Sequence, residues 1–270
     1  MQIPAVPNRS RFWFRLGVCA IVKPAKRDSL PPSSPLFIGS TVLLTGVGAE
    51  GQVGEVVARA FADLGASLVL VDRKVDRVQE RAAAVARLGR SARGYGCDLA
   101  DPEAVAALAS TIRKNHGEKL RALVHMAGGF AMSGPVAQSA IEVWNRQIAA
   151  NLTTAFLTSR AFLPMLRADR GSIVFFSSDA VLPGGSVAEI SAYAAAKAGV
   201  AALMRAIAAE EAANGVRVNA LAPAAIRTAT NIASMGETVR YVEREQVADV
   251  VTFLCSPQAS SISGVLLPLA

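Results

Sequence analysis

Thr41-Val-Leu-Leu-Thr-Gly-Val-Gly-Ala-Glu-Gly-Gln-Val-Gly54 is the stretch that decides the fold of this 270-residue chain. Its first four residues are an apolar run that predicts a short buried strand. Four glycines follow at positions Gly46, Gly48, Gly51 and Gly54, and the apolar spacing beyond them predicts a helix that stops at Gly65. A glycine-rich turn lets the backbone approach a pyrophosphate, and the N-terminus of the next helix stabilises its charge. The stretch therefore predicts the phosphate-binding opening of a dinucleotide-binding fold.

A carboxylate follows the next predicted strand. Residues 67–71 form a second apolar run, which ends at Asp72. An acidic residue at this strand end can bind the adenosine ribose hydroxyls, and it favours NAD because it would repel a 2′-phosphate. Arg73 and Lys74 follow directly, and either could pair with that phosphate, so NADP remains possible.

The rest of the chain continues the alternation of strands and helices. Further strands are predicted around 94–97, 120–126, 171–176, 217–221 and 265–267, and the longest helices at about 75–88, 141–166 and 191–213. Asp98 follows the third strand and is placed to meet an adenine, whereas Asp101 is typical of a helix N-cap. The order predicts a Rossmann-type α/β fold, a doubly wound, seven-stranded parallel sheet with helices on both faces.

The motif Ser191-Ala-Tyr-Ala-Ala-Ala-Lys197 carries candidate proton-transfer chemistry. Tyr193 and Lys197 stand four residues apart on a predicted helix, so their side chains share one face. A free phenol has a pKa of about 10, and moving it near 7 takes roughly 4 kcal/mol of preferential phenolate stabilisation, which a nearby cation can supply. The pair therefore predicts an acid/base acting on a hydroxyl or carbonyl oxygen. The same spacing is common on solvated helix faces, so the motif needs its context.

Polar residues elsewhere supply that context. Ser177 and Ser178 end the fifth predicted strand, where open α/β sheets bind ligands. Ala127-Gly128 ends the fourth strand and permits a second close approach of the backbone to a cofactor. Asn151 lies within a predicted helix, where an amide is usually a solvated or satisfied polar residue. His125 is expected to be structural rather than catalytic.

Together these pieces resemble the short-chain dehydrogenase/reductase family in its single-domain form, over residues 37–270. The matching residues are Thr45-Gly46 with Gly51 and Gly54, Asp72, Asp98-Leu99, Ala127-Gly128, Asn151, Ser177-Ser178, Tyr193 to Lys197, and Asn219 to Thr228. The resemblance implies that Tyr193 exchanges the proton and that Lys197 lowers its pKa and holds the nicotinamide ribose. It also implies that Ser178 orients the substrate oxygen and that Asn151 supports a water connected to Lys197.

The cofactor site that the resemblance implies draws on most of these motifs. Its residues are Gly46, Gly51, Gly54, Asp72, Arg73, Asp98, Leu99, Ala127, Gly128, Tyr193, Lys197, Pro223, Ile226 and Thr228. Ile226 and Thr228 would face the nicotinamide carboxamide. The chain also departs from the family pattern. Its glycine turn is longer, His125-Met126 replaces the usual pair of asparagines, the spacing from Ser178 to Tyr193 is larger, Ala224 replaces a glycine, and the lid region after Thr228 is short.

The resemblance implies an NAD(P)-dependent oxidoreductase that interconverts a secondary alcohol and a ketone by hydride transfer. It is closest to the 3-oxoacyl-thioester reductase branch and to sugar or polyol dehydrogenases. The altered glycine turn and short lid leave open an alternative, a catalytically weak sensor or scaffold protein that binds the nucleotide. The expected partner is a small hydroxy or keto substrate. A homo-oligomer, tetramer or dimer, is also expected, since small residues on two helices permit close pairing: Ala149, Ala150, Ala194 to Ala196, Ala198 and Ala201.

Charge and composition exclude several other classes. Six basic residues and one acidic residue lie within residues 1–38, which therefore hold most of the net charge of +7. The remainder is nearly neutral, so nucleic-acid binding is not implied. Residues 1–36 lack a steady period and predict a poorly ordered N-terminal extension, with a targeting role left open, before a single domain over 37–270.

Cysteine and histidine usage narrows the chemistry further. Cys19, Cys97 and Cys255 lie far apart and fit neither a disulfide framework nor a metal site, which favours a reducing, cytoplasmic location. The chain has only two histidines, so no metal is expected. The apolar segment 12–22 is interrupted by Arg15 and is too short to cross a bilayer, so no membrane association is expected.

Overall fold

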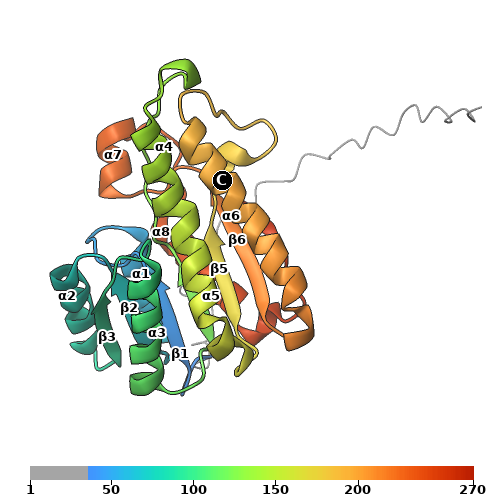
Figure 1. The fold of residues 1–270 in the computed structure, drawn as a ribbon. Coiled ribbons are helices and arrows are strands. Elements are labelled where there is room, and N and C mark those ends of the chain that lie inside the picture. The colour runs from blue at the N-terminus through green and yellow to red at the C-terminus, as the bar shows by residue number, and fades with distance from the viewer. Residues whose placement is uncertain (1–35) are drawn as a thin grey trace, which may run out of the picture. The chain divides into compact units, whose positions relative to one another are not determined.

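A computed structural model describes residues 36–270, which form a seven-stranded sheet between two layers of helices (Figure 1). The strands are β1 (Thr41–Thr45), β2 (Ser67–Asp72), β3 (Ala92–Gly96), β4 (Ala122–His125), β5 (Ser172–Phe176), β6 (Arg217–Pro223) and β7 (Leu266–Leu269). All neighbours pair in parallel, in the order β3-β2-β1-β4-β5-β6-β7. The predicted doubly wound parallel sheet is confirmed. The proposed N-terminal extension lies, except for its last residue, outside the described residues.

Helices cover both faces of the sheet. On one face lie α1 (Val53–Asp63), α2 (Val75–Ala86) and α8 (Arg244–Cys255), and on the other α3 (Pro102–His116), α5 (Thr154–Arg167) and α6 (Ser191–Glu210). The remaining helices are α4 (Ile141–Ile148), which leads into α5, and α7 (Ala229–Met235) after β6. Short 3₁₀ turns occupy Val136–Gln138, Asp179–Val181, Ala212–Asn214 and Pro257–Ala259.

The two hydrophobic cores follow from the alternation of side chains along each strand. In β1, Leu43 packs toward α3, α5 and α6, whereas Val42 and Leu44 pack toward α1, α2 and α8. All three side chains are fully buried. A parallel sheet covered on both faces needs such uninterrupted apolar strands, which is why the short runs in the sequence marked them well.

A π turn interrupts the long helix predicted over 141–166. Residues Ala149–Thr153 form this turn between α4 and α5, and they include Asn151. A π turn inserts one extra residue into the helix and is frequent at functional sites. The apolar periodicity of the sequence continues on either side, so it predicted one regular helix.

Helix α6 is the only described helix long and apolar enough to cross a membrane by length and composition. Its apolar character is explained by packing, because nine of its residues are buried within the fold. Ala194, Ala196 and Ala201 are among them, and a Cβ on Gly199 would lie 2.7 Å from Leu152. These small residues therefore allow close packing inside the subunit, whereas Ala195 and Ala198 of the suggested pairing face are exposed, and the pairing itself stays a prediction.

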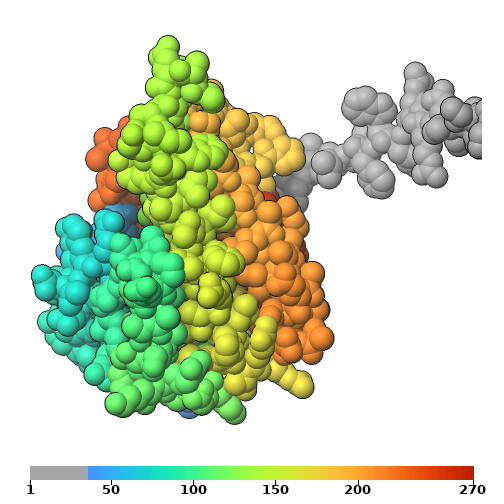
Figure 2. Space-filling model, viewed as in Figure 1, coloured from blue at the N-terminus to red at the C-terminus, as the bar shows by residue number. Residues whose placement is uncertain are grey.

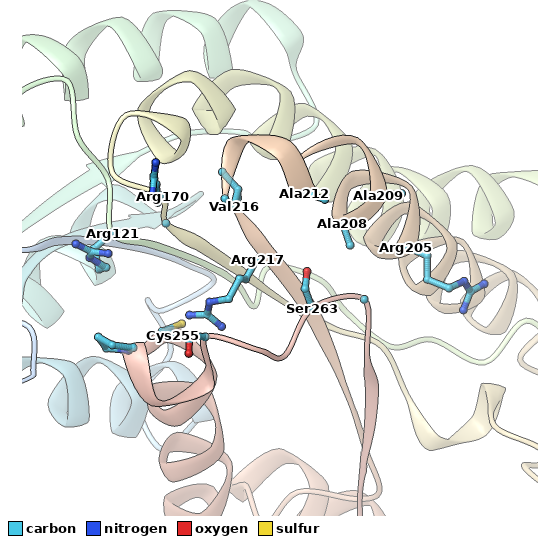
Figure 3. Close-up of a pocket in the computed structure, with 15 residues that line it drawn as sticks. Arg121, Arg170, Arg205, Ala208, Ala209, Ala212, Val216, Arg217, Cys255 and Ser263 are labelled. Atoms are coloured by element: carbon cyan, nitrogen blue, oxygen red, sulfur yellow. The ribbon is translucent and has the colours of Figure 1, made fainter.

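A cavity of about 700 Å³ lies at the amino ends of β4 to β7 (Figure 3). Four arginines line it: Arg121, Arg170, Arg205 and Arg217. Arg217 donates to the carbonyls of Leu254 (2.6 Å) and Ser256 (3.1 Å) at the end of α8, and Arg121 donates to the Asp169 carbonyl (3.2 Å) beyond α5. Because helix C-termini carry partial negative charge, these two arginines are explained as helix caps. The candidate catalytic residues lie at the opposite edge of the sheet.

Candidate active site

Ser178 and Tyr193 meet where the carboxyl end of β5 faces the first turn of α6. The two side chains interact, because Ser178 lowers the pKa of Tyr193. Ser178 is buried, and its Oγ also accepts from the Ala180 N–H at 3.3 Å. The neighbouring Ser177 hydroxyl instead donates to the backbone carbonyl of Lys197 at 2.9 Å. The structure therefore places Ser178, and not Ser177, beside the phenol.

Lys197 lies one helical turn beyond Tyr193 and is buried. Its Nζ donates to the Phe176 carbonyl at 2.9 Å and lies 5.7 Å from the centroid of the Tyr193 ring. Burial lowers the pKa of Lys197 to about 8. The Lys197 amine is therefore mostly protonated at neutral pH, although its burial disfavours the charged form.

The pKa of Tyr193 moves opposite to the direction implied by the resemblance. Burial raises this pKa above its ordinary value, the hydrogen bond with Ser178 lowers it, and the Asp179 charge raises it. The phenol is consequently protonated at neutral pH, the form that donates a proton to a ketone oxygen.

Asn151 ties the π turn to the loop that follows β4. Its Nδ2 donates to the Gly129 carbonyl at 2.9 Å, and its Oδ1 accepts from the Gly129 N–H at 3.1 Å. Nδ2 also donates to the Gln147 carbonyl at 3.1 Å. A Cβ on Gly128 would lie 2.6 Å from Asn151 Oδ1 and 3.5 Å from Lys197 Nζ, so only glycine fits between these groups. The water link between Asn151 and Lys197 stays a prediction.

His125 links three elements beneath the site through both ring nitrogens. Nδ1 lies 3.2 Å from Thr45 Oγ1 on β1, and Nε2 lies 3.2 Å from Thr154 Oγ1 on α5. The Thr154 hydroxyl donates to the Ala150 carbonyl at 2.8 Å, so it accepts from Nε2–H, and Nδ1 accepts from Thr45. Thr45 Oγ1 in turn accepts from the Ala127 N–H at 3.2 Å. The structural role expected for His125 is therefore specific: a neutral imidazole joins β1, β4 and the π turn.

The glycine turn is packed as a phosphate-binding turn requires. Gly46 has φ 72°, and a Cβ there would lie 2.7 Å from the Ala127 nitrogen. A Cβ on Gly54 would lie 2.7 Å from Val47 Cα. Both positions therefore need glycine, because the turn packs directly against the end of β4 and against the start of α1, as the glycines of a dinucleotide-binding turn do. The turn is longer than is usual in the family before Gly51. The Gly51 N–H donates to a Glu55 carboxylate oxygen at 2.7 Å.

Asp72 stands at the end of β2, directly against this turn. Its Oδ2 accepts from the Gly48 N–H at 2.9 Å, and its Oδ1 accepts from the Lys74 N–H at 3.1 Å. Arg73 and Asp98 are exposed nearby along the same edge, and Leu99 is buried. The predicted adenosine-binding residues thus follow adjacent strands β2 and β3, as the parallel order requires.

The segment after β6 completes the row of candidate site residues at the carboxyl ends of the strands. Thr228 caps α7 by accepting from the Asn231 N–H at 3.2 Å, and Asn231 Nδ2 donates to the Ile226 carbonyl at 2.8 Å. Pro223 is the last residue of β6. Helix α7 has seven residues, consistent with the short lid expected, and Thr230 Oγ1 accepts from Gln52 in the glycine turn at 3.1 Å. The lid is therefore joined to the predicted phosphate site.

Sequence reasoning missed Phe130 and Asp179. The Phe130 ring meets the Tyr193 ring edge-on, with centroids 5.1 Å apart, and Asp179 Oδ1 accepts from Ser178 Oγ at 3.3 Å. Neither belongs to a motif, and only their positions directly after strand-end motifs could have signalled them. Among the described residues, no group of three or more His, Cys, Asp or Glu side chains could hold a metal ion.

Comparisons with known proteins agree with this geometry. A family model described as Enoyl-(Acyl carrier protein) reductase matches residues 46–269. The chain is 35% identical over 225 residues to the inactive 2-(S)-hydroxypropyl-CoM dehydrogenase 2 of Xanthobacter autotrophicus, covering 77% of this chain and 95% of the relative. It is 30% identical over 238 residues to the D-threitol dehydrogenase of Mycolicibacterium smegmatis, covering 84% and 89%.

A solved structure extends the likeness to the fold. A 3-oxoacyl-[acyl-carrier protein] reductase with bound NAD from Brucella melitensis superimposes with a TM-score of 0.78 at 28% identity, covering 91% of this chain and 96% of that one. The glycine cradle and Asp72 fit a dinucleotide of this kind. The chain therefore belongs to the short-chain dehydrogenase/reductase family and is an NAD(P)-dependent oxidoreductase that interconverts alcohols and ketones.

Proposed function

We propose that Tyr193 is the proton donor and acceptor of this oxidoreductase and that Ser178 holds the substrate oxygen. The observation that carries the proposal is the position of Ser178 and Tyr193 together at the carboxyl edge of the sheet, with Lys197 one turn away and its Nζ 5.7 Å from the Tyr193 ring centroid. A carbonyl oxygen placed against both groups would receive a hydrogen bond from the Tyr193 hydroxyl and a second from the Ser178 hydroxyl, once that hydroxyl turns away from Asp179 Oδ1. The pair thus selects a substrate oxygen that accepts hydrogen bonds, as a ketone does.

The roles of the remaining residues follow from their positions. When bound, the nicotinamide supplies or accepts the hydride. In ketone reduction Tyr193 gives its proton to the carbonyl oxygen, and its high pKa keeps that proton available at neutral pH. The buried Lys197 ammonium stabilises the phenolate that remains and is placed to bind the nicotinamide ribose. Asn151 holds the loop at Gly129 beside the Lys197 ammonium.

Replacing the phenol tests this assignment. Tyr193→Phe keeps the ring that Phe130 contacts but removes the hydroxyl, so kcat for ketone reduction should fall by about 10²- to 10⁴-fold, the usual contribution of general acid–base catalysis. NADH should still bind, as measured by fluorescence titration, because the other residues of the cofactor site are intact. A variant that retains more than half of the wild-type kcat would refute the role of Tyr193.

A catalytically weak nucleotide-binding protein is the second candidate. It is supported by the Glu55 carboxylate, which accepts from the Gly51 N–H at the helix end that the pyrophosphate should meet, while Arg81 pairs with its other oxygen at 3.1 Å. Both candidates predict cofactor binding, so turnover separates them. Wild-type protein that binds NAD(P)H yet oxidises none of it with a panel of ketones would favour the second candidate.

We propose that NAD is preferred over NADP. Asp72 lies at the end of β2 with its carboxylate against Gly48, where a 2′-phosphate would meet a negative charge. Arg73 is exposed and offers only a mobile counter-charge. Thermal-shift titration with NADH and NADPH tests the proposal, and tighter binding of NADPH would contradict it.

A homo-oligomer, dimer or tetramer, is also proposed. The long helix formed by α4 and α5 exposes Ile141, Trp144 and Phe156, and Figure 2 shows it uncovered across the front of the molecule. Exposed large apolar side chains on one element are typical of interaction surfaces. Light scattering should give a mass that is a multiple of the 28.1 kDa subunit, decreasing for Phe156→Arg. A wild-type mass of one subunit would contradict the proposal.

We also propose that the protein is located in the cytoplasm. Cys97 and Cys255 are free and buried, and burial raises their pKa to about 11 and about 12, respectively. Unreactive buried thiols need no oxidising compartment. Fractionation of native cells tests the location, and recovery of the protein in an organelle or membrane fraction would oppose it.

A further inference from the structure

An aromatic side chain forms one wall of the reaction site. The Phe130 ring contacts the Tyr193 ring edge-on at 5.1 Å, yet 61% of Phe130 is exposed. An edge-on contact of this kind favours the observed orientation of the ring. The uncovered part of Phe130 therefore presents an apolar surface beside the phenol that transfers the proton.

The loop that carries Phe130 is bound to the start of α6. The N–H groups of Ser133 and Gly134 both donate to the Glu189 carbonyl, at 2.7 and 3.0 Å. The Ser133 hydroxyl lies 3.2 Å from the hydroxyl of Ser191, the first residue of α6. These bonds fix the loop relative to Tyr193, two residues farther along, so the apolar wall belongs to a built site.

Further apolar side chains extend from the two joined segments. Met132, two residues after Phe130, is 55% exposed, and Val187, two residues before Glu189, is 47% exposed. Figure 1 shows the loop before α4 and the loop before α6 at the same end of the molecule, above the carboxyl ends of the strands. Exposed apolar residues gathered at a reaction site favour an apolar ligand.

One charge also faces the site. Asp179 is exposed, and its Oδ1 accepts from the Ser178 hydroxyl at 3.3 Å, next to the proposed position of the substrate oxygen. Its negative charge also raises the pKa of Tyr193. A negative charge at this position repels an anionic substrate, such as a keto acid.

We infer that the substrate is an uncharged, mainly apolar ketone or secondary alcohol, with Phe130 as its apolar contact and Asp179 as the group that rejects anions. The inference rests on the proposed function. It names a substrate class different from the polyol in the name of the threitol-oxidising relative. The assignment follows from the residues around Tyr193 and from no motif of the family.

Three ketones of similar size distinguish the substrate classes. Cyclohexanone is apolar, dihydroxyacetone is polar and uncharged, and acetoacetate is anionic. Wild-type kcat/KM with NADH should be highest for cyclohexanone. Phe130→Ser should lower the cyclohexanone-to-dihydroxyacetone ratio by about 10-fold or more, the range of hydrophobic discrimination in enzyme sites. Leu88→Ser, an exposed apolar residue beyond α2, is the matched control and should leave the ratio unchanged.

Asp179→Asn tests the rejection of anions. This variant should raise the acetoacetate-to-cyclohexanone ratio roughly two- to fivefold, which is what an exposed charge pair supplies. A higher kcat/KM for dihydroxyacetone than for cyclohexanone, or an equal loss of both in Phe130→Ser, would overturn the substrate class while leaving the proposed function intact. Reduction of no ketone would instead refute the proposed function.

A binding measurement keeps the assignment testable without turnover. In saturation-transfer NMR with equal concentrations of cyclohexanol and glycerol, wild-type protein should transfer signal to cyclohexanol, and Phe130→Ser should lose it. Equal signals from both alcohols, or a cyclohexanol signal that Phe130→Ser retains, would overturn the inference.

Discussion

Replacing His125 by Phe should weaken the fold at neutral pH and make it less sensitive to acid. Both ring nitrogens are hydrogen-bonded, and the residue is 3% exposed. Without the imidazole, the Thr45 hydroxyl loses its acceptor in a fully buried position. Leaving a buried donor unsatisfied costs about 1–3 kcal/mol. The Thr154 hydroxyl keeps its bond to the Ala150 carbonyl, so it adds little to the loss.

Acid should destabilise the wild type more than the His125→Phe variant. Burial, with the Lys197 charge, lowers the pKa of His125 from 6.5 to about 3. Between these two values the unfolded chain binds a proton that the folded chain does not, so wild-type stability falls as the pH falls below 6.5. Linkage gives a loss of about 2 kcal/mol between pH 7.5 and 5.0 from His125 alone. The Phe variant lacks this proton site and loses nothing through it.

Urea unfolding of both proteins at pH 7.5 and 5.0, at one protein concentration, measures the two effects. The wild type should be more stable at pH 7.5, and the difference should shrink by about 2 kcal/mol at pH 5.0. His116→Phe serves as a control: the pKa of His116 is lowered too, but this residue is only partly buried, so its variant should change less. If wild type and His125→Phe lose stability in parallel, the assignment of a buried neutral imidazole is wrong.

Four further substitutions test the geometry around the site. Gly128→Ala places a methyl group 2.6 Å from Asn151 Oδ1 and should cost about 1–3 kcal/mol in urea unfolding, and an unchanged midpoint would contradict this packing. Ser177→Ala removes a hydrogen bond to the backbone of α6, so it should lower the free energy of unfolding by about 1 kcal/mol and leave kcat nearly unchanged. Ser178→Ala should instead lower kcat about 100-fold. Equal losses of kcat in the two variants would argue against the assignment of Ser178, and not Ser177, to the reaction. Asp72→Ser should reduce the ratio of NADPH to NADH dissociation constants at least about 10-fold, and a constant ratio would remove Asp72 from cofactor selection.

The fold could be predicted because its local signals agree with each other. The strand of residues 41–45 is apolar on both faces, and glycine follows where the backbone must turn beside β4. Buried parallel strands leave such short runs in a sequence, and their alternation with helices permits few topologies. The prediction of seven strands in a doubly wound sheet therefore needed no tertiary information.

The details of the site could not be predicted in the same way. The π turn at Asn151 depends on amide bonds to Gly129, which lies on another element. The orientation of Ser177 depends on a carbonyl of α6. The pKa of Tyr193 depends on burial, on Ser178 and on the Asp179 charge. Each property is set by groups distant in sequence, so spacing alone gives the residue and not its state.

The cluster beneath Tyr193 holds one buried cation, and this explains how His125 can replace an asparagine. Burial lowers the pKa of Lys197 to about 8, and a second charge nearby would be disfavoured further. His125 avoids that charge because one nitrogen donates to Thr154 and the other accepts from Thr45, bonds that only a neutral ring can make together. An asparagine amide also offers one donor group and one acceptor without charge. Neutral imidazole and amide can therefore serve the same tie between strands, whereas a permanent cation at position 125 would compete with Lys197 for the single charge that the site accommodates.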